Sequence, residues 1–393
     1  MTVAPRSERT RTPHTVFVLA SLALGGAESQ LTSMLEAVDG HPDGLRATVL
    51  TLTTNHDPSL VHRLAAIGVP VATVDRAATS FPAFFTALVR WFRRARPVLV
   101  HTVLSGSTGT WGRLAARLAG VRVIIHSERS LAPRRTRMQM VFEPLAHSFT
   151  TRFFTNARAI AERLEGEGVS PGRIRVLRNG VDLARFTSRT APLRTEWGVD
   201  ADAFVVGALG SLRPIKRPDL LLDAVALLPI AERPDLVVFG GDGPLLPTLR
   251  ARVADDPWSR DHVRFLGQVG DVPRFLAALD VLALSSDTEG LPNAIIEAMA
   301  AGVPCVATRV SDVPDLVTDN GWVVTPGDAS ELARALAAMR ALDADERSAM
   351  GLRGRVRAES EYSLDVAAKR FWDAHREVLD AVPARRSGVA ARA

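Results

Sequence analysis

The fold of this chain is decided at residues 285–306, which read SSDTEGLPNAIIEAMAAGVPCV. The residues just before them, VLAL at 281–284, form the apolar run of a parallel strand that is buried on both faces. Pro292 suits the first position of a helix, where its missing N–H would be unpaired in any case. Gly302 suits the helix end, because glycine adopts left-handed geometry without strain. Another apolar run begins at 303–306, so the stretch predicts a strand, a loop, a helix and a second strand.

Polar side chains sit at the functional edge of this predicted unit. Glu289 lies in the loop after a strand, at the edge of an open α/β sheet where ligands bind. Asn293 and Glu297 are four residues apart, so they share one helix face, and the helix N-terminus attracts an anion. Together these groups indicate a phosphate-bearing ligand with hydroxyl groups on either side. The alternative is structural: Glu289 would cap the helix and Glu297 would pair with a surface cation.

The order of residue types around the two glutamates resembles the E-x7-E motif of retaining GT-B glycosyltransferases, above all family 4 (glycosyltransferase group 1). EGLPN begins at Glu289 and EAMAAGVPCVAT begins at Glu297. The resemblance covers nearly the whole chain and is strongest over 204–330. It implies that Glu289 contacts hydroxyls of a donor sugar and that Glu297 holds the ribose of its nucleotide. The other donor-binding residues that it implies in this stretch are Gly290, Leu291, Pro292 and Asn293.

Size and composition fit a globular protein of two domains. With 393 residues the chain is too long for one compact core, and 47% apolar with 23% charged residues is an ordinary balance. Cys305 is the only cysteine and falls on an expected buried strand, so a reducing, cytoplasmic setting fits. Residues 1–14 lack the apolar core of a signal peptide. Apolar runs stay far shorter than the ~18 residues of a membrane span.

The formal charge of +5 is carried largely by arginine. It is compatible with an anionic ligand, with an anionic membrane surface or with an arginine-rich proteome. Nucleic-acid binding is not favoured, because no basic stripe interleaved with aromatics appears. RWFRRAR at 90–96 and SERSLAPRRTRMQM at 127–140 would form a basic, partly aromatic face for an anionic membrane. Solvated helix faces are the alternative for both runs.

In the first half, strands and helices alternate, which predicts a parallel, doubly wound sheet. Gly25 and Gly26 form a turn between the first strand and its helix, an elbow suited to phosphate. The family resemblance places this GGAE turn in the cleft between donor and acceptor. His101 and His126 each end a strand. The resemblance matches His126 to a histidine that meets the donor sugar, and gives His101 a supporting role. Structural histidines are the commoner case for both.

In the second half, GSLRPIKRPD follows an apolar strand and begins at Gly210. Basic groups between a strand and a helix suit a diphosphate. The family pattern here is G-R-L-x-x-x-K-G. Lys216 matches its lysine, Ser211 replaces its arginine, and Arg213 would supply the missing charge. The alternative is that Arg213 and Lys216 are exposed loop charges.

Other matches to the family are weaker. Gly241 lies in GGDGP, a turn that the resemblance brings close to the nucleotide, and Leu266 lies in VRFLG, near the base. Ser311 and Asp312 stand where the family has glycines, which puts a close backbone approach there in doubt. Arg178 stands where the family has proline in PNGVD.

We therefore expect an α/β protein of the GT-B type, with two Rossmann-like, doubly wound domains facing each other across a cleft. The predicted order is a disordered N-terminus at 1–14, an acceptor domain at 15–185, a linker at 186–200, a donor domain at 201–360, a helix at 361–382 that crosses back to the first domain, and a disordered tail at 383–393. Phe371 and Trp372 would anchor the crossing helix.

The predicted activity is retaining transfer of a hexosyl group from a UDP- or GDP-linked sugar to a glycan, lipid-linked or small-molecule acceptor. Bacterial cell-surface polysaccharide or glycoconjugate synthesis is the expected setting. The predicted catalytic residues are Glu289, Lys216, Arg213 and His126. No metal or other cofactor is expected, because the cationic side chains would offset the charge of the departing diphosphate. Two alternatives stay open: a sugar-nucleotide epimerase of the same fold, and a non-catalytic sugar-nucleotide-binding protein.

Overall fold

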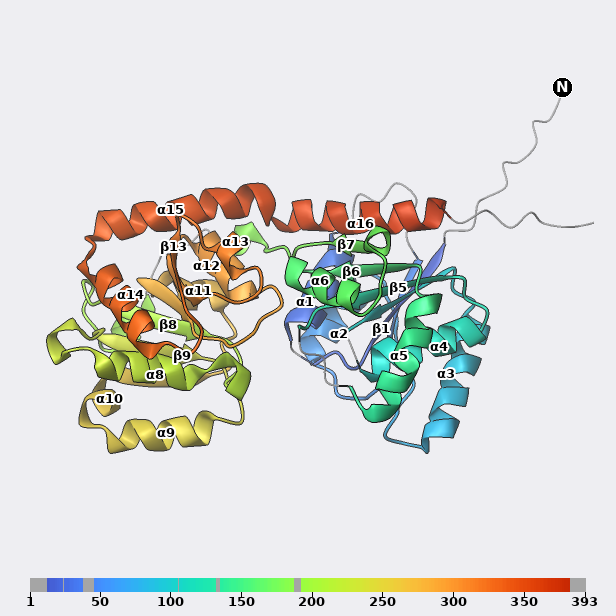
Figure 1. The fold of residues 1–393 in the computed structure, drawn as a ribbon, viewed down its shortest axis with the longest axis horizontal. Coiled ribbons are helices and arrows are strands. Elements are labelled where there is room, and N and C mark those ends of the chain that lie inside the picture. Colours follow the sequence, from blue (N-terminus) through green and yellow to red (C-terminus); the bar gives the residue numbers. More distant parts are fainter. Residues whose placement is uncertain are drawn as a thin grey trace, which may run out of the picture.

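The computed structural model describes residues 13–23, 25–37, 46–104, 106–131, 135–186 and 192–381. The predicted disorder at both ends therefore lies almost wholly outside the described residues, as does part of the predicted linker. Figure 1 shows two lobes side by side, the first from the blue and green part of the chain and the second from the yellow and orange part. Each lobe is built on its own parallel sheet, so the predicted two-domain α/β fold is confirmed.

The first sheet has seven parallel strands in the order β3-β2-β1-β4-β5-β6-β7. The order reverses direction between β1 and β4, and ligands of doubly wound sheets bind at such a point, at the carboxyl ends of the strands. The strands are β1 (His14–Leu19), β2 (Arg46–Thr51), β3 (Val71–Thr73), β4 (Leu99–Val103), β5 (Val123–Glu128), β6 (Arg152–Thr155) and β7 (Ile174–Val176).

Helices pack on both faces of this sheet (Figure 1), which is why apolar side chains of one strand enter cores on both sides. In β1, Phe17 and Leu19 join one core while Val16 and Val18 join another on the opposite face. The helices are α1 (Gly26–Glu36), α2 (Pro58–Ala66), α3 (Phe81–Ala95), α4 (Ser107–Leu118), α5 (Arg137–Phe149) and α6 (Arg158–Gly166).

The second sheet has six parallel strands in the order β10-β9-β8-β11-β12-β13. They are β8 (Val205–Leu209), β9 (Leu236–Gly240), β10 (Val263–Gly267), β11 (Val281–Leu284), β12 (Cys305–Thr308) and β13 (Gly321–Val324). The helices of this half are α7 (Pro192–Glu196), α8 (Pro218–Leu227), α9 (Leu246–Asp255), α10 (Pro257–His262), α11 (Val272–Ala277), α12 (Asn293–Ala301), α13 (Val313–Leu316) and α14 (Ala329–Ala341).

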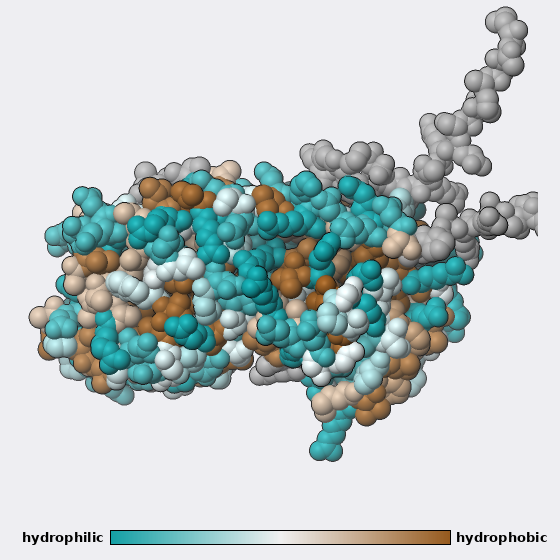
Figure 2. Space-filling view, turned by 45° about the horizontal axis from the view of Figure 1, so that its top comes forward, coloured by the Kyte–Doolittle hydropathy of each residue, from teal (hydrophilic) through white to brown (hydrophobic). Residues whose placement is uncertain are grey.

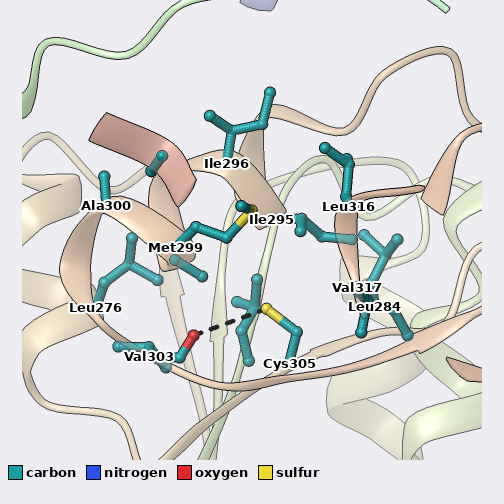
Figure 3. Close-up of a cluster of buried hydrophobic side chains, with 14 of the residues drawn as sticks. Leu276, Leu284, Ile295, Ile296, Met299, Ala300, Val303, Cys305, Leu316 and Val317 are labelled. Atoms are coloured by element: carbon teal, nitrogen blue, oxygen red, sulfur yellow. Dashed lines mark hydrogen bonds between the residues drawn. The ribbon is translucent and has the colours of Figure 1, made fainter. Parts of the chain in front are cut away.

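The helix at residues 293–301, α12, is held by an apolar core beneath it (Figure 3). Ile295, Ile296 and Met299 are fully buried there. Cys305 lies in the same cluster, where burial raises the pKa of its thiol to about 12, so it is a structural residue. The helix ends at Gly302 with φ of +70°, in the left-handed geometry that the sequence predicts. It begins one residue later than expected, because Pro292 is the last residue before it.

Two long helices, α15 (Ala344–Glu361) and α16 (Leu364–Asp380), run end to end across both lobes (Figure 1). Between them, Tyr362 O accepts a hydrogen bond from Val181 N at 2.8 Å, and Val181 O accepts one from Leu364 N at 2.9 Å. The two places where the chain passes between the halves therefore lie side by side. On the first lobe, the Trp372 indole donates to Met34 O at 2.9 Å. No helix in the described part of the chain is long and apolar enough to cross a membrane.

Candidate active site

Glycines form the floor of the cleft on the second lobe. Gly210 follows β8 and Gly241 follows β9, with φ of +146° and +144°. A Cβ on Gly241 would lie 1.9 Å from Gly210 O, so the two strand ends meet without side chains. Gly241 N donates to Gly267 O at 2.7 Å, which joins β10 to the same edge. Leu266, on that edge strand, is partly exposed beside the glycines.

The polar centre of the site is the contact between Lys216 and Glu289. Lys216 Nζ lies 2.6 Å from each oxygen of the Glu289 carboxylate, although the residues are 73 positions apart. The Ser286 hydroxyl donates to the same carboxylate at 2.6 Å, and Thr308 holds the Ser286 backbone by a hydrogen bond to its carbonyl. Glu289 is 8% exposed while the Lys216 side chain is 33% exposed. A ligand that binds Glu289 would therefore replace hydrogen bonds that the carboxylate now accepts from Lys216 and Ser286.

A cavity of about 340 Å³ opens beside this pair at the carboxyl ends of β8 and β11. Its wall includes Gly210, Ser211, Lys216, Ser285 and Ser286. Ser211, which replaces the family's arginine, thus faces the cavity. Arg213 lies just before the 3₁₀ turn Pro214–Lys216 with its side chain exposed.

The N-terminus of α12 follows the loop that carries Glu289 and has no side-chain cap. Leu291 and Pro292 are buried before it, and Gly290 packs so closely on Arg129 O that a Cβ would lie 2.6 Å away. One turn further on, burial raises the pKa of Glu297 to about 7, and Arg185 lowers it by a smaller amount. A partly buried carboxylate with a raised pKa is a group suited to accepting hydrogen bonds from a ligand.

The first lobe meets α12 through a chain of hydrogen bonds. Asn293 Oδ1 accepts from Asn179 Nδ2 at 2.5 Å, and Asn179 Oδ1 accepts from the Arg129 guanidinium. Gly26 also lies close to Asn293: a Cβ added at Gly26 would be 3.0 Å from the Asn293 amide nitrogen. Gly25 precedes α1, and Gly26 and Asn293 are the first residues of α1 and α12, so the two helix N-termini lie close together. The glycine turn and the EGLPN loop, far apart in sequence, are thus brought together.

Among the described residues, two arginines of the first lobe line a second cavity in the cleft, Arg129 and Arg178. Burial lowers the pKa of the Arg129 guanidinium to about 10, and the nearby Glu28 opposes that shift. Burial also raises the pKa of Glu28. This cavity, of about 490 Å³, is also lined by Gln30, Asn179 and Phe371.

The same cavity is lined by His101 and Ser127, which form a directed chain of hydrogen bonds. His375 Nδ1 lies 2.8 Å from Phe371 O and therefore carries the proton. His101 Nδ1 then donates to His375 Nε2 at 2.9 Å, and the Ser127 hydroxyl donates to His101 Nε2 at 2.7 Å. Burial, followed by the charge of His375, lowers the pKa of His101 well below its ordinary value. The lowered pKa favours a neutral His101, which accepts the hydrogen bond that fixes the Ser127 hydroxyl.

The expected order of the two histidines is reversed. His126 pairs with Thr102 across the β4–β5 register, whereas His101 pairs with Ile125, so the two rings lie on opposite faces of the sheet. His126 is 1% exposed, its Nδ1 lies 2.9 Å from the Thr102 hydroxyl, and it packs against Gly109 of α4. His101, and not His126, therefore lines the cavity.

Several groups of this site escape sequence reasoning. Ser286 and Arg129 lie just after the strands β11 and β5, and Asn179 belongs to an Asn-Gly turn. Residues at strand ends and turns often bind ligands, so these positions could have identified the three residues from the sequence. His375 gave no such signal, because it reaches His101 from a helix 274 residues away. Among the described residues, no group of three or more His, Cys, Asp or Glu side chains could hold a metal ion.

Two doubly wound domains whose glycine-lined strand ends face each other across a cleft, joined by a crossing C-terminal helix pair, define the GT-B class of glycosyltransferases. Models of this class match both halves: "Glycosyltransferase Family 4" matches residues 24–185 and "Glycosyl transferases group 1" matches residues 203–341. The chain belongs to this family of glycosyltransferases.

Similar proteins agree with this assignment. An Escherichia coli UDP-Gal:alpha-D-GlcNAc-diphosphoundecaprenol alpha-1,3-galactosyltransferase is 33% identical over 64% of this chain and 68% of its own length. A D-inositol 3-phosphate glycosyltransferase from Saccharomonospora viridis is 31% identical over 72% and 70%. Among solved structures, Anabaena HepE in complex with UDP-glucose has a TM-score of 0.79 at 23% identity, over 93% of this chain and 99% of that one.

Proposed function

We propose that this glycosyltransferase moves a hexosyl group, with retention at the anomeric carbon, from a UDP- or GDP-linked sugar to a glycan, lipid-linked or small-molecule acceptor. The setting that we propose is bacterial cell-surface polysaccharide or glycoconjugate synthesis on the cytoplasmic side. Supporting this choice, the E. coli relative is named for a UDP-linked donor and a diphosphoundecaprenol acceptor.

The observation that carries the proposal is the Lys216–Glu289 contact at the N-terminus of α12. A cation and a carboxylate 2.6 Å apart, close in sequence to an uncapped helix N-terminus, suit one ligand that has both phosphates and hydroxyls. A nucleotide-diphosphate sugar is such a ligand. Free phosphate would use only half of the arrangement, and a neutral sugar only the other half.

In this proposal each donor-side residue has one role. Glu289 accepts hydrogen bonds from the sugar hydroxyls, and Glu297 accepts them from the ribose. Lys216, with the α12 N-terminus, stabilises the charge that develops on the leaving diphosphate. The exposed Arg213 reaches the same phosphates and offsets the absence of an arginine at Ser211. Gly210 and Gly241 allow the close backbone approach.

The acceptor side of the proposal rests on the first lobe. Ser127 and Arg129 line the cavity next to the α1 N-terminus, so a hydroxyl and an anionic group of the acceptor would both find partners there. This part replaces the sequence-based choice of His126.

The first test is thermal unfolding with UDP, GDP and ADP, each at the same saturating concentration. A ligand at about 100 times its dissociation constant adds roughly 2.7 kcal/mol to the native state, which raises the melting temperature by several degrees for a chain of this size. We expect a shift with UDP or GDP, and a smaller one in Glu297→Ala. Asp287→Asn, an exposed loop carboxylate that pairs with Arg217, is the matched control. No shift with any nucleotide would contradict the proposal.

The nucleotide that binds then defines a panel of donor sugars, and product analysis separates transfer from epimerisation. An epimerase would convert the donor sugar without an acceptor. A transferase releases the nucleoside diphosphate in proportion to glycosidic product. Nucleotide binding without either reaction would favour the binding-protein alternative.

A further inference from the structure

The cavity of about 490 Å³ in the first lobe lies at the carboxyl ends of three neighbouring strands. Its polar wall includes His101 of β4, Ser127 of β5 and Asn156, which directly follows β6. The apolar part of the wall consists of Leu31, Met34, Val103, Phe154, Leu177, Ala367 and Phe371. An apolar wall with a few fixed polar groups is typical of a small-molecule site, and the polar groups decide which ligand fits.

The direction of the hydrogen bond at Ser127 is set by a backbone carbonyl of α16. Phe371 O can only accept, so His375 Nδ1, which lies 2.8 Å away, carries a proton. His375 Nε2 then accepts from His101 Nδ1 at 2.9 Å. His101 Nε2 is left as the group that accepts from the Ser127 hydroxyl at 2.7 Å. Ser127 therefore uses its only hydroxyl proton inside the protein.

Helix α16 holds this carbonyl in place on the first lobe. The Trp372 indole donates to Met34 O at 2.9 Å, which ties the helix to the lobe. Figure 2 shows hydrophilic residues along the upper edge of the molecule, where Figure 1 places α16. The exposed side chains of the helix are all charged: Asp365, Lys369, Arg370, Arg376, Glu377 and Asp380. Its other side therefore faces the sheet, and a carbonyl inside a helix keeps its direction.

Aromatic rings surround His101 and disfavour a charge on it. The centroid of its ring lies 5.4 Å from that of Phe17, 5.5 Å from that of Phe154 and 5.8 Å from that of Phe371. An imidazolium is poorly solvated among such groups, and burial lowers the pKa of His101 well below its ordinary value. A neutral His101 has one nitrogen that donates and one that accepts, as this chain of hydrogen bonds requires.

Two oxygens in the wall of the cavity are therefore open to donors from a ligand. Within the described part of the chain, Ser127 Oγ receives no hydrogen bond, because its bond to His101 uses its proton and leaves both lone pairs. Asn156 Oδ1 is buried and has no hydrogen-bond partner among the described residues. A buried oxygen without a donor costs free energy, so its place in a cavity wall indicates a ligand that supplies O–H or N–H groups.

We propose that Ser127 determines specificity by accepting a hydrogen bond from a sugar hydroxyl of the acceptor substrate, and that His101 and His375 are the positioning residues that give Ser127 this direction. The assignment to the acceptor substrate rests on the proposed function. Asn156 accepts from a second hydroxyl, and the C–H face of the sugar ring covers the apolar wall. An ether or carbonyl oxygen in place of the first hydroxyl would face a lone pair of Ser127, so such a compound is rejected.

The direction of the hydrogen bonds is tested by nitrogen-15 NMR of the full chain with labelled histidine, because the signals of the two ring nitrogens report which of them carries the proton. We expect His101 and His375 to be neutral at pH 7, each with its proton on Nδ1. Variants that lack each ring assign the signals. Protonation of His375 would reverse the chain of hydrogen bonds. A charged ring at either position, or a proton on His101 Nε2, would therefore overturn the proposal, and this measurement needs no substrate.

His375→Leu removes the group that accepts from His101 Nδ1. We expect the His101 proton to move to Nε2 in this variant, whereas a purely structural role of His375 would leave the proton where it is and overturn the positioning role. His14→Leu is the matched control. His14 is also buried, with Nδ1 3.2 Å from Ala95 O and Nε2 2.9 Å from the Thr48 hydroxyl, but it lies at the amino end of β1. This variant should leave the His101 signals unchanged.

The role of Ser127 is tested by initial rates with the donor and the acceptor that product analysis identifies. Ser127→Ala should raise the KM of the acceptor substrate by about tenfold and change the KM of the donor by less than about twofold, because only the acceptor loses a hydrogen bond. Ser127→Thr keeps the hydroxyl and should raise the acceptor KM less. His375→Leu should raise it by about threefold, and His14→Leu should not.

An acceptor KM in Ser127→Ala equal to that of the native chain would overturn the proposal. Nucleotide binding, read from thermal unfolding, tests the proposed function separately. If no nucleotide binds while the histidine signals are as expected, the direction of the hydrogen bonds stands and its assignment to the acceptor substrate falls.

Discussion

One carboxylate in each lobe, Glu143 in the first and Glu297 in the second, has its pKa shifted in the opposite direction by its surroundings. In the first lobe, burial would raise the pKa of Glu143, but His147 and Arg113 lower it far below its usual range. In the second lobe, burial raises the pKa of Glu297 to about 7, and Arg185 opposes this only weakly. The first carboxylate has all of its hydrogen bonds inside the protein, whereas the second has the capacity to accept more. The comparison separates a carboxylate that holds the fold from one available to a ligand.

The largest expected effect is a loss of transfer activity when Glu289 is changed. Glu289 is another carboxylate of the donor lobe, and in our proposal it contacts the donor. Glu289→Gln keeps the shape but removes the charge that pairs with Lys216 and contacts the donor in our proposal. We expect transfer to fall by about 10³-fold, with a loss of stability under about 1 kcal/mol because Lys216 can turn to solvent. Initial rates with the identified donor measure the first, and urea unfolding the second. Asp287→Asn is the control; equal rates for the two variants would remove Glu289 from the site.

The next effect concerns stability in the first lobe. Glu143→Gln leaves the buried Arg113 without its counter-charge, so we expect the free energy of unfolding to fall by about 3 kcal/mol at pH 7. Glu377→Gln, which breaks an exposed pair with Arg175, should cost about 0.5 kcal/mol or less. The loss should be seen in urea unfolding, while nucleotide-induced shifts persist.

The pH dependence of that loss sharpens the comparison. Because the native pKa of Glu143 lies below its unfolded value, its contribution is complete above an unfolded pKa of about 4.3 and is lost as the pH falls below it. Native and Glu143→Gln proteins should therefore become more similar in stability toward pH 3. A constant difference between them would mean that Glu143 does not hold its charge in the fold.

The smallest effect is expected at Glu297 and has the opposite sign. Its raised pKa means that the native state binds a proton that the unfolded chain releases, so this contribution to stability is lost as the pH rises toward 7. Nucleotide binding should instead strengthen as the carboxylate ionises. We expect the dissociation constant of the nucleotide to rise up to about tenfold from pH 8 to pH 6, beyond any change seen in Glu297→Gln. Titration calorimetry of both proteins measures this, and parallel pH profiles would contradict it.

The donor lobe was predictable because its site is local in sequence. Glu289, Asn293 and Glu297 lie within one loop and the helix that follows it, so their spacing alone places them on one edge. The parallel sheet was predictable for the same reason, because each apolar run that marks a buried strand is a local pattern. In the first lobe, Arg113, Glu143 and His101 depend on pairings between distant elements, which no local pattern contains.

Helix α5 shows a second limit. Its apolar period identifies a helix stripe, but periodicity cannot tell which side faces the core. Here the apolar stripe lies outward, because Glu143 on the other side of the helix pairs with the buried Arg113 of α4. Helix α15 escaped for a different reason. Gly351 lies in its middle, which lowers helix propensity, yet a Cβ there would be 1.9 Å from Gly302 O, so close packing on α12 requires the glycine.

The paired crossings at Val181 and Tyr362 limit the motions that the two lobes can make. A single connection would leave the lobes free to twist as well as to bend. Two adjacent chain segments, tied by hydrogen bonds of 2.8 and 2.9 Å, resist twisting and leave bending about the line through them as the easy rotation. Since the strand ends of both sheets lie along the cleft, that single degree of freedom changes the gap between donor and acceptor while keeping the two sets of residues in register.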